Sequence, residues 1–135
     1  NSLISEIDSY SDESNLWVVE HGIGNSSGTL ALHIAGNLNH FIGSVLGKSG
    51  YVRHRESEFS DRNVPRQQIV GILQHLRTHI SDVIFKIDES ALEMPYPLEK
   101  HGQIVTHRHM LLHLLCHLNY HLGQVNYHRR LIDLK

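Results

Sequence analysis

The sequence has one cysteine, Cys116, among its 135 residues, so the chain cannot form an internal disulfide bond. Small secreted domains usually depend on disulfides, whereas reducing compartments such as the cytoplasm keep thiols free. No apolar run approaches the ~18 residues that a membrane-spanning helix needs, and no charged segment leads into an apolar one as in a signal peptide. These absences exclude a disulfide scaffold, and we expect a cytoplasmic protein with no membrane partner.

An excess of basic residues is also missing. Twelve Lys and Arg stand against fourteen Asp and Glu, which gives a formal net charge of -2 at pH 7. Surfaces that bind nucleic acids are normally rich in Lys and Arg, so we expect no nucleic-acid partner. Histidine, by contrast, is abundant, with thirteen residues. Because imidazole is a common metal ligand and titrates near neutral pH, the histidines are the leading candidates for functional residues.

Alternating polar and apolar positions, which are typical of β-strands, do not persist anywhere in the chain. Apolar residues instead recur every three or four positions in four segments. These segments are residues 2–10, 26–47, 65–87 and 103–132. Ser26 or Ser27 can cap the second segment, and Pro65 suits the first turn of the third because its missing N–H has no helical partner there. We therefore predict an all-α protein.

A long, charge-rich stretch, residues 48–63, separates the second and third predicted helices. Loops of this length are often functional or cross between distant ends of a domain. We predict a four-helix bundle with a long crossover connection, and a plain up-down-up-down bundle is the alternative. The length suits a single domain, residues 1–135. Since the first segment is short and the chain opens on Asn1, we expect the first helix to be truncated at its N-terminus.

Polar side chains run along two of the predicted helices, directly beside their apolar faces. Each residue of an α-helix turns by about 100°, so residues three or four apart share one sector of the surface. The stripe on the last helix holds His113, His117 and His121, and the stripe on the second holds His33, Asn37 and His40. Such stripes are costly to bury unless the polar groups pair with one another or bind something.

A metal ion bound between the two stripes explains their position. His117 and His121 are four residues apart, so two rings on one helix can reach one ion, and His33 can supply a third nitrogen from across the bundle. Three protein ligands leave coordination positions open, as in catalytic sites. Spacing alone does not settle the ligand set, because His40 can replace His33 or act beside it, and His113 also lies one turn from His117.

Two stretches carry a resemblance to a known family. "LHIAGNLNHFI" in the second predicted helix and "HLNYHLGQV" in the last are similar to the DinB-like family of small helical proteins, which includes YfiT-like metal-dependent hydrolases. The resemblance extends over nearly the whole chain. It implies a bundle of crossed topology, frequent homodimers, and a nickel or zinc ion held by a histidine triad that falls on His33, His117 and His121, with Gly123 and Gln124 completing the motif.

The resemblance and the stripes together predict a metal-dependent enzyme of the hydrolase or small-thiol transferase type, since several relatives transfer low-molecular-weight thiols or isomerise thiol adducts. We expect a small thiol-containing substrate, with Asn37 and His40 as candidates for catalytic or orienting groups. The arginines of the charge-rich stretch suit a substrate carboxylate; they are Arg53, Arg55 and Arg62. The alternative is a non-catalytic dimeric module that binds metal or serves a stress-related binding role. Substrate, metal identity and catalysis itself stay open.

The remaining residues of interest have simpler expected roles. Five histidines are expected to be solvated or to lie at a dimer face, namely His75, His79, His107, His109 and His128. Cys116 is expected to be a small buried hydrophobe, and Trp17 a core residue. An apolar face on the third predicted helix can dock a second copy of the chain; it consists of Leu76, Ile80 and Ile84.

Overall fold

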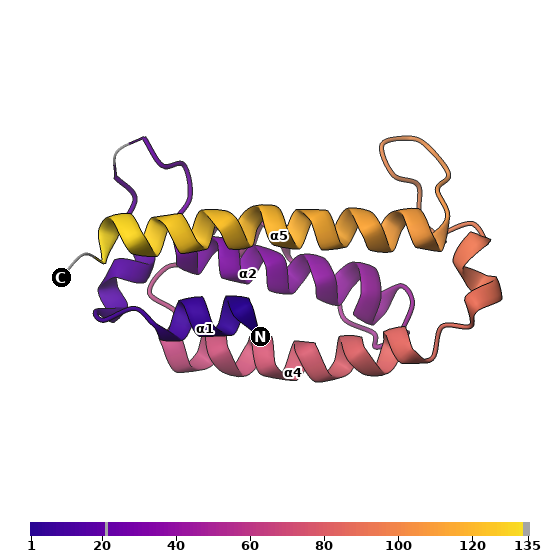
Figure 1. Ribbon diagram of the computed structural model, residues 1–135, viewed down its shortest axis with the longest axis horizontal. Helices are drawn as coiled ribbons and strands as arrows, with labels where there is room; N and C mark the ends of the chain where they lie inside the picture. The colour runs from indigo at the N-terminus through magenta and orange to yellow at the C-terminus, as the bar shows by residue number, and fades with distance from the viewer. Residues whose placement is uncertain (21, 134–135) are drawn as a thin grey trace.

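The computed structural model describes residues 1–20 and 22–133, and the regular secondary structure in these ranges is helical throughout (Figure 1). The α-helices are α1 (Ser2–Asp8), α2 (Ser27–Leu38), α3 (Arg55–Ser60), α4 (Arg66–Phe85) and α5 (His107–Ile132). Two short 3-10 helices, η1 (Glu13–Trp17) and η3 (Glu89–Glu93), and a π-helical turn, η2 (Asn39–Ser44), complete the set. The all-α prediction is confirmed.

Neighbouring residues fix the direction of the central helices. A side chain on Gly43 would meet His79, and one on Gly47 would meet Val83, so α2 with its π-helical extension runs parallel to α4. In Figure 1 the colours show α1 and α5 running the opposite way along the long axis. Parallel α2 and α4 require the chain to return along the bundle between them. The crossover connection is therefore confirmed, and the up-down-up-down alternative is wrong.

The crossover itself is more ordered than its charge-rich sequence indicates. Residues 55–60 form α3, which packs on α2. Glu58 of α3 is buried, and the ring of Phe59 lies 4.9 Å, centroid to centroid, from that of His33. Gly36 of α2 makes this approach feasible, because a Cβ there would collide with the Glu58 carboxyl. The connection thus delivers side chains to the face of α2 that carries His33.

Apolar side chains from α1, α2, α4 and α5 fill the space between the helices. The main core holds Ile7, Tyr10, Leu16, Leu30, Ile34, Ile69, Leu73, Leu76 and Val125, and a smaller one holds Ile42, Tyr96, Met110 and Leu114. Trp17 packs against the main core as predicted. Leu76 belongs to this core and is 5% exposed, so it cannot dock a second copy as proposed from the sequence. None of the described helices combines the length and apolar character of a membrane span.

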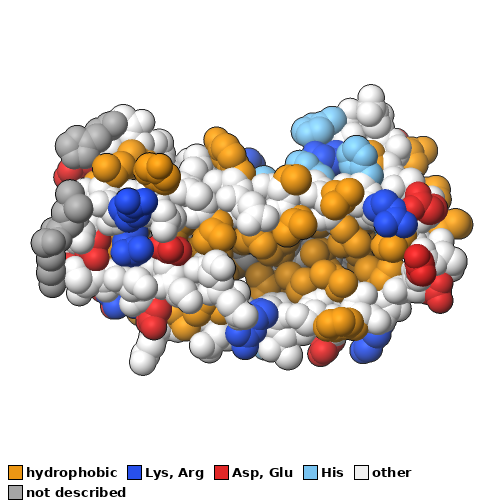
Figure 2. All heavy atoms as spheres, in the orientation of Figure 1, with side chains coloured by type: hydrophobic (Ala, Val, Ile, Leu, Met, Phe, Trp, Pro, Cys, Tyr) orange, Lys and Arg blue, Asp and Glu red, His pale blue; other side chains and the backbone are white. Residues whose placement is uncertain are grey.

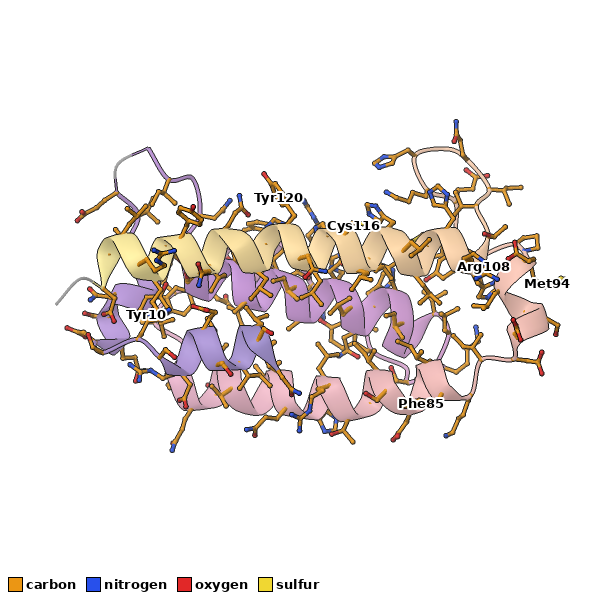
Figure 3. The ribbon with its side chains drawn as sticks, viewed as in Figure 1. Tyr10, Phe85, Met94, Arg108, Cys116 and Tyr120 are labelled. Atoms are coloured by element: carbon orange, nitrogen blue, oxygen red, sulfur yellow. The ribbon has the colours of Figure 1, made fainter. Side chains whose placement is uncertain are left out.

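The predicted burial of Cys116 is wrong. It is exposed on α5, on the outer side of the helix with Tyr120 (Figure 3). The reason is helical phase: Leu114 and Val125 take the inward positions of α5, and Cys116 follows Leu114 by about 200°. Its thiol therefore faces away from the core.

His128 is the second residue whose environment differs from the prediction, because it is 2% exposed instead of solvated. Its Nε2 lies 2.8 Å from the Val18 carbonyl oxygen and therefore donates to it. Its Nδ1 then accepts from the Tyr10 hydroxyl at 2.7 Å, and the same hydroxyl is bonded to Ser27. Burial raises the pKa of Tyr10 to about 12. This fully paired network ties α5 to the N-terminal part of the chain.

Two helix boundaries also differ from those expected. The last helix begins at His107, with the Thr106 hydroxyl accepting from the His109 N–H, because residues 95–106 form a small hairpin-like loop instead of a first helical turn. Pro65 stands just before α4 as its N-cap, with ψ 138, and not inside its first turn. Neither change moves the residues of the polar stripes out of their helices. The expected N-terminal truncation of the first helix stays a prediction.

Candidate metal centre

Three imidazoles meet where α2 and α5 pack against each other. His33 projects from α2, and His117 and His121 project from successive turns of α5. His117 Nε2 lies 3.3 Å from His33 Nε2 and 3.1 Å from His121 Nε2. Within the described residues, this trio is the group of His, Cys, Asp or Glu whose ligand atoms all lie within 4.8 Å of one another. The three histidines that were predicted from the sequence as metal ligands therefore lie close together.

The spacing of the nitrogens suits one ion. Imidazole nitrogens bind zinc at about 2.1 Å, so nitrogens 3.1 and 3.3 Å apart would subtend angles of roughly 95° and 104° at a shared ion. These angles lie between the octahedral and tetrahedral values. The rings also approach from different directions, with the planes of His33 and His121 at 89°. Three lone pairs can thus point at one centre.

In two of the rings, the hydrogen-bond partner of the outer nitrogen indicates which nitrogen carries the hydrogen. His33 Nδ1 lies 2.9 Å from Glu58 Oε2, and His121 Nδ1 lies 2.6 Å from Gln124 Oε1. Oxygen acceptors require the hydrogen on Nδ1, and at His33 the Glu58 oxygen is closer than the Arg53 NH2 group, which lies 3.4 Å from the same Nδ1. In the neutral form of each ring, Nε2 then carries a lone pair. His117 Nε2 faces both lone pairs and can donate one hydrogen to only one of them. Without a cation, at least one close nitrogen pair lacks a hydrogen between its atoms.

The protonation states also suit metal binding. Burial, assisted by His121 and His33, lowers the pKa of His117 to about 4. Burial likewise lowers the pKa of His33, despite the opposing effect of Glu58. Both rings are therefore neutral at pH 7, which is the form that binds metal ions. His33 is 7% exposed, whereas His117 and His121 are half-buried, so the trio lies at the edge of the core and not deep within it.

Buried Glu58 and partly buried Arg53 form an ion pair behind His33 that the sequence did not reveal. Arg53 Nε donates to Glu58 Oε1 at 2.6 Å, and the Arg53 terminal NH2 group donates to Glu58 Oε2 at 2.8 Å. Burial would raise the pKa of Glu58, but the hydrogen bonds from Arg53 and His33 lower it below its ordinary value. A charge-rich stretch normally indicates a solvated surface, so the pattern of this stretch offered no reason to expect that Glu58 is buried. The glycine at position 36, which leaves space for the Glu58 carboxyl, is the feature that could have indicated it.

The arginines proposed for a substrate carboxylate have other partners. Arg53 is bound to Glu58, and the Arg55 guanidinium lies 5.2 Å from the centre of the Phe59 ring. Arg62 donates to the carbonyl oxygens of Phe59 and Asp61. Arg53 in particular donates two hydrogen bonds to an internal carboxylate, and its expected role toward a substrate stays a prediction.

Asn37 and His40 follow His33 along the same helix. Asn37 is 8% exposed, and no described group hydrogen-bonds its Oδ1. The buried Nδ1 of His40 is likewise without a partner in the described part of the chain. His40 lies in the π-helical turn, a distortion that occurs frequently at functional sites. Buried polar atoms without partners are uncommon, so both atoms are unusual features of this helix.

His40 and His113 both remain outside the trio. The His113 ring centroid is 6.1 Å from that of His117, and burial lowers the pKa of His113. Burial, assisted by Arg53, also lowers the pKa of His40, whose ring packs on Phe41. Neither residue joins the group of converging ligand atoms found in the described residues. The geometry thus favours His33 over His40 in the ligand set.

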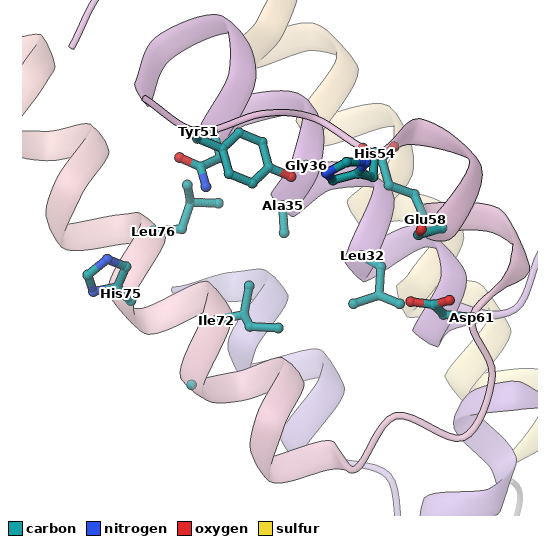
Figure 4. Close-up of a pocket in the computed structure, with 13 residues that line it drawn as sticks. Leu32, Ala35, Gly36, Tyr51, His54, Glu58, Asp61, Ile72, His75 and Leu76 are labelled. Carbon is teal, nitrogen blue, oxygen red and sulfur yellow. The ribbon is translucent and has the colours of Figure 1, made fainter. Parts of the chain in front are cut away.

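A cavity lies between α2, α3 and α4 (Figure 4). It has a volume of about 570 Å³, an apolar wall that includes Leu32 and Ile72, and a polar rim with Tyr51 and His54. Glu58 also lines it, but none of the three imidazoles does. The cavity is therefore separate from the metal centre.

Comparison with known proteins adds a family but no function. Residues 4–135 match the model of a family described as "Protein of unknown function (DUF1572)". No curated protein matches the chain.

Proposed function

The chain belongs to the DUF1572 family, and on that basis we propose that it is a metal-dependent enzyme whose divalent ion is held by His33, His117 and His121. The supporting observation is the approach of His121 Nε2 and His33 Nε2 to within 3.1 and 3.3 Å of His117 Nε2. We propose zinc or nickel, because nitrogen ligands suit both ions. The similarity of the two histidine stretches to DinB-like and YfiT-like proteins supports the same assignment.

The charges around the site indicate what kind of ligand would bind. The three imidazoles bring no negative charge to a bound ion, and the Glu58 carboxylate beside them is already balanced by Arg53. A divalent ion would therefore keep most of its charge, which favours an anionic group such as a thiolate or carboxylate. We propose a small thiol-containing substrate and a hydrolase or thiol transferase reaction. A bound divalent ion would supply Lewis acidity that lowers the pKa of water or thiol.

Asn37 and His40 are the proposed orienting groups. The unpartnered Oδ1 of Asn37 can accept a hydrogen bond and so hold a substrate N–H or O–H. The unpartnered Nδ1 of His40 can accept a proton, because burial lowers the pKa of His40 and keeps the ring neutral at pH 7. Both residues precede α3 in the chain; Asn37 lies on α2 with His33, and His40 lies in η2, which continues α2.

A dimeric form is a further proposal, supported by the outer face of α5. Several apolar side chains along this helix are more than half exposed, namely Leu112, Leu115, Tyr120, Tyr127 and Leu131. Figure 2 shows separate groups of hydrophobic side chains along the edge of the molecule where α5 runs. Such a stripe is unusual on a monomer and fits a second copy of the chain. The same stripe supports the alternative function, a non-catalytic dimeric metal-binding module. Sedimentation analysis of the metal-loaded protein tests the oligomeric state, and a monomer would contradict it.

The first test is the metal content of protein purified without a histidine tag or nickel column. We expect about one divalent ion per chain, and we expect His117→Ala to lose at least tenfold in metal affinity because two ligands rarely hold an ion alone. His109→Ala is the matched control, since His109 is exposed on the same helix. Equal metal content in the two variants would contradict the proposal. A screen for hydrolysis and thiol transfer with the loaded enzyme then separates the enzyme from the non-catalytic module.

A further inference from the structure

The crossover connection contributes a charged group to the metal centre. Glu58 reaches His33 from the side opposite His117, because its Oε2 contacts Nδ1 of the ring whose Nε2 faces the other two histidines. We propose that Glu58 is a positioning residue that fixes the proton and orientation of His33 and thereby sets the metal affinity, and that Arg53 holds Glu58 in place. This inference rests on the proposed metal centre.

The carboxylate of Glu58 is held on every side. Both of its oxygens accept from Arg53, at 2.6 and 2.8 Å, and Oε2 also accepts from His33. Glu58 is 6% exposed, and the Gly36 backbone lies against it. A carboxylate fixed in this way cannot follow the imidazole if the ring turns. The ring must therefore keep the orientation that points Nε2 toward His117.

An ion pair between Arg53 and Glu58 alone does not explain this arrangement. Arg53 already satisfies Glu58 by two charge-assisted hydrogen bonds, so a pair serving only the fold would gain nothing specific from an imidazole. A carboxylate on the outer nitrogen of a metal-binding histidine makes the inner nitrogen a better donor, and removing such a partner typically costs 10–100-fold in metal affinity. Phe59 packs on the same ring at 4.9 Å and restricts it further.

The other rings have different support. His121 is held by Gln124, a neutral amide one turn away on the same helix. His33 alone among the three is supported by a charged residue from a distant segment, 25 residues along the chain. A change in the conformation of the crossover is therefore expected to alter the orientation of His33 before that of the other two rings. This makes Glu58 the most informative residue to change outside the ligands themselves.

The test is a zinc competition titration of untagged apoprotein against a chromophoric chelator. We expect Glu58→Gln to weaken zinc binding about tenfold and Glu58→Ala to approach the upper end of the 10–100-fold range. The control is Glu6→Gln, which removes a comparable carboxylate whose Oε2 accepts from Arg129 Nε at 2.8 Å, far from His33. We expect the control to bind zinc as tightly as the wild type. Circular dichroism in excess chelator checks that each variant folds.

A second measurement needs no variant and covers the case in which Glu58 variants fail to fold. Nitrogen NMR of the zinc-loaded wild type reports which nitrogen of His33 carries the proton. The proposal predicts a proton on Nδ1 and zinc on Nε2, and zinc on Nδ1 would overturn it. Folded Glu58→Gln with wild-type affinity would overturn it as well. Absence of zinc binding by the wild type would instead overturn the proposed metal centre, so the two failures are distinguishable.

Discussion

At the scale of single residues, the histidines divide by what each ring nitrogen contacts. His33 and His121 have an oxygen acceptor on Nδ1 and a nitrogen neighbour on Nε2, which leaves a lone pair directed at the centre. In His128 both nitrogens are satisfied within the protein, by a hydroxyl and a carbonyl oxygen. The lone pairs of His33 and His121 can therefore bind a cation, whereas both nitrogens of His128 already have hydrogen-bond partners.

The second arrangement predicts a purely structural role for His128. We expect His128→Ala to lower the free energy of unfolding by about 2–4 kcal/mol, because it opens a cavity and leaves the buried Tyr10 hydroxyl with one partner fewer. Chemical denaturation measures this loss, and zinc affinity should stay unchanged. His109→Ala, at an exposed position of the same helix, should change stability by less than about 0.5 kcal/mol. A similar loss in both variants would show that the buried network contributes nothing.

At the scale of helices and connections, each contact that closes the bundle joins segments far apart in sequence. Asp133, at the end of α5, accepts hydrogen bonds from the backbone and hydroxyl of Ser11 and from the Asn15 side chain. Burial would raise the pKa of Asp133, but these hydrogen bonds lower it well below its ordinary value. The carboxylate thereby anchors the C-terminal helix to η1 only while it is ionised.

This anchor predicts a pH-dependent contribution to stability. Because the pKa of Asp133 is lower in the folded state, its contribution is full above the unfolded pKa of about 3.9 and is lost as the pH falls below that value. We expect Asp133→Asn to lower the free energy of unfolding by about 1 kcal/mol at pH 7, a modest value since solvent screens the site. The difference should be smaller at pH 2 than at pH 7, because the contribution declines as the pH falls toward the lowered pKa of the folded state. Denaturation curves at both pH values measure it, and a constant difference would contradict the anchor.

The helices were more predictable than the connections. Apolar spacing marks α2, α4 and α5 because they bury one face, and the same spacing placed His117 and His121 on one side of α5. The crossover gave no such signal, since α3 is one short helix whose burial depends on Gly36 and Arg53. The π-helical turn after α2 was also invisible, because an ideal 3.6-residue period does not include it.

Residues that pack on other segments escaped sequence analysis for the same reason. His128 resembles a surface residue in a polar stretch, and its burial depends on Tyr10 and Val18 from the other end of the chain. Glu58 looks solvated among charged neighbours, and its burial depends on the fold of the crossover. In contrast, the convergence of His33 with two histidines some 84 residues away followed from a motif, not from local periodicity.

At the scale of the whole molecule, the crossed bundle brings three separate segments to one point. Helix α2 carries His33, α5 carries His117 and His121, and the crossover between α2 and α4 supplies Glu58. A bound ion would therefore join elements from the first, middle and last thirds of the chain. That a single domain spans residues 1–135 stays a prediction, as do the enzyme class and the dimer.

X-ray absorption spectroscopy of the untagged protein loaded with one equivalent of zinc tests the central claim most directly. The account predicts three imidazole nitrogens at about 2.0–2.1 Å, with the remaining positions filled by lighter oxygen donors. It also predicts that the imidazole signal diminishes in His33→Ala and is unchanged in His109→Ala. A zinc ion with one imidazole or none, or with a sulfur ligand from Cys116 at about 2.3 Å, would contradict it.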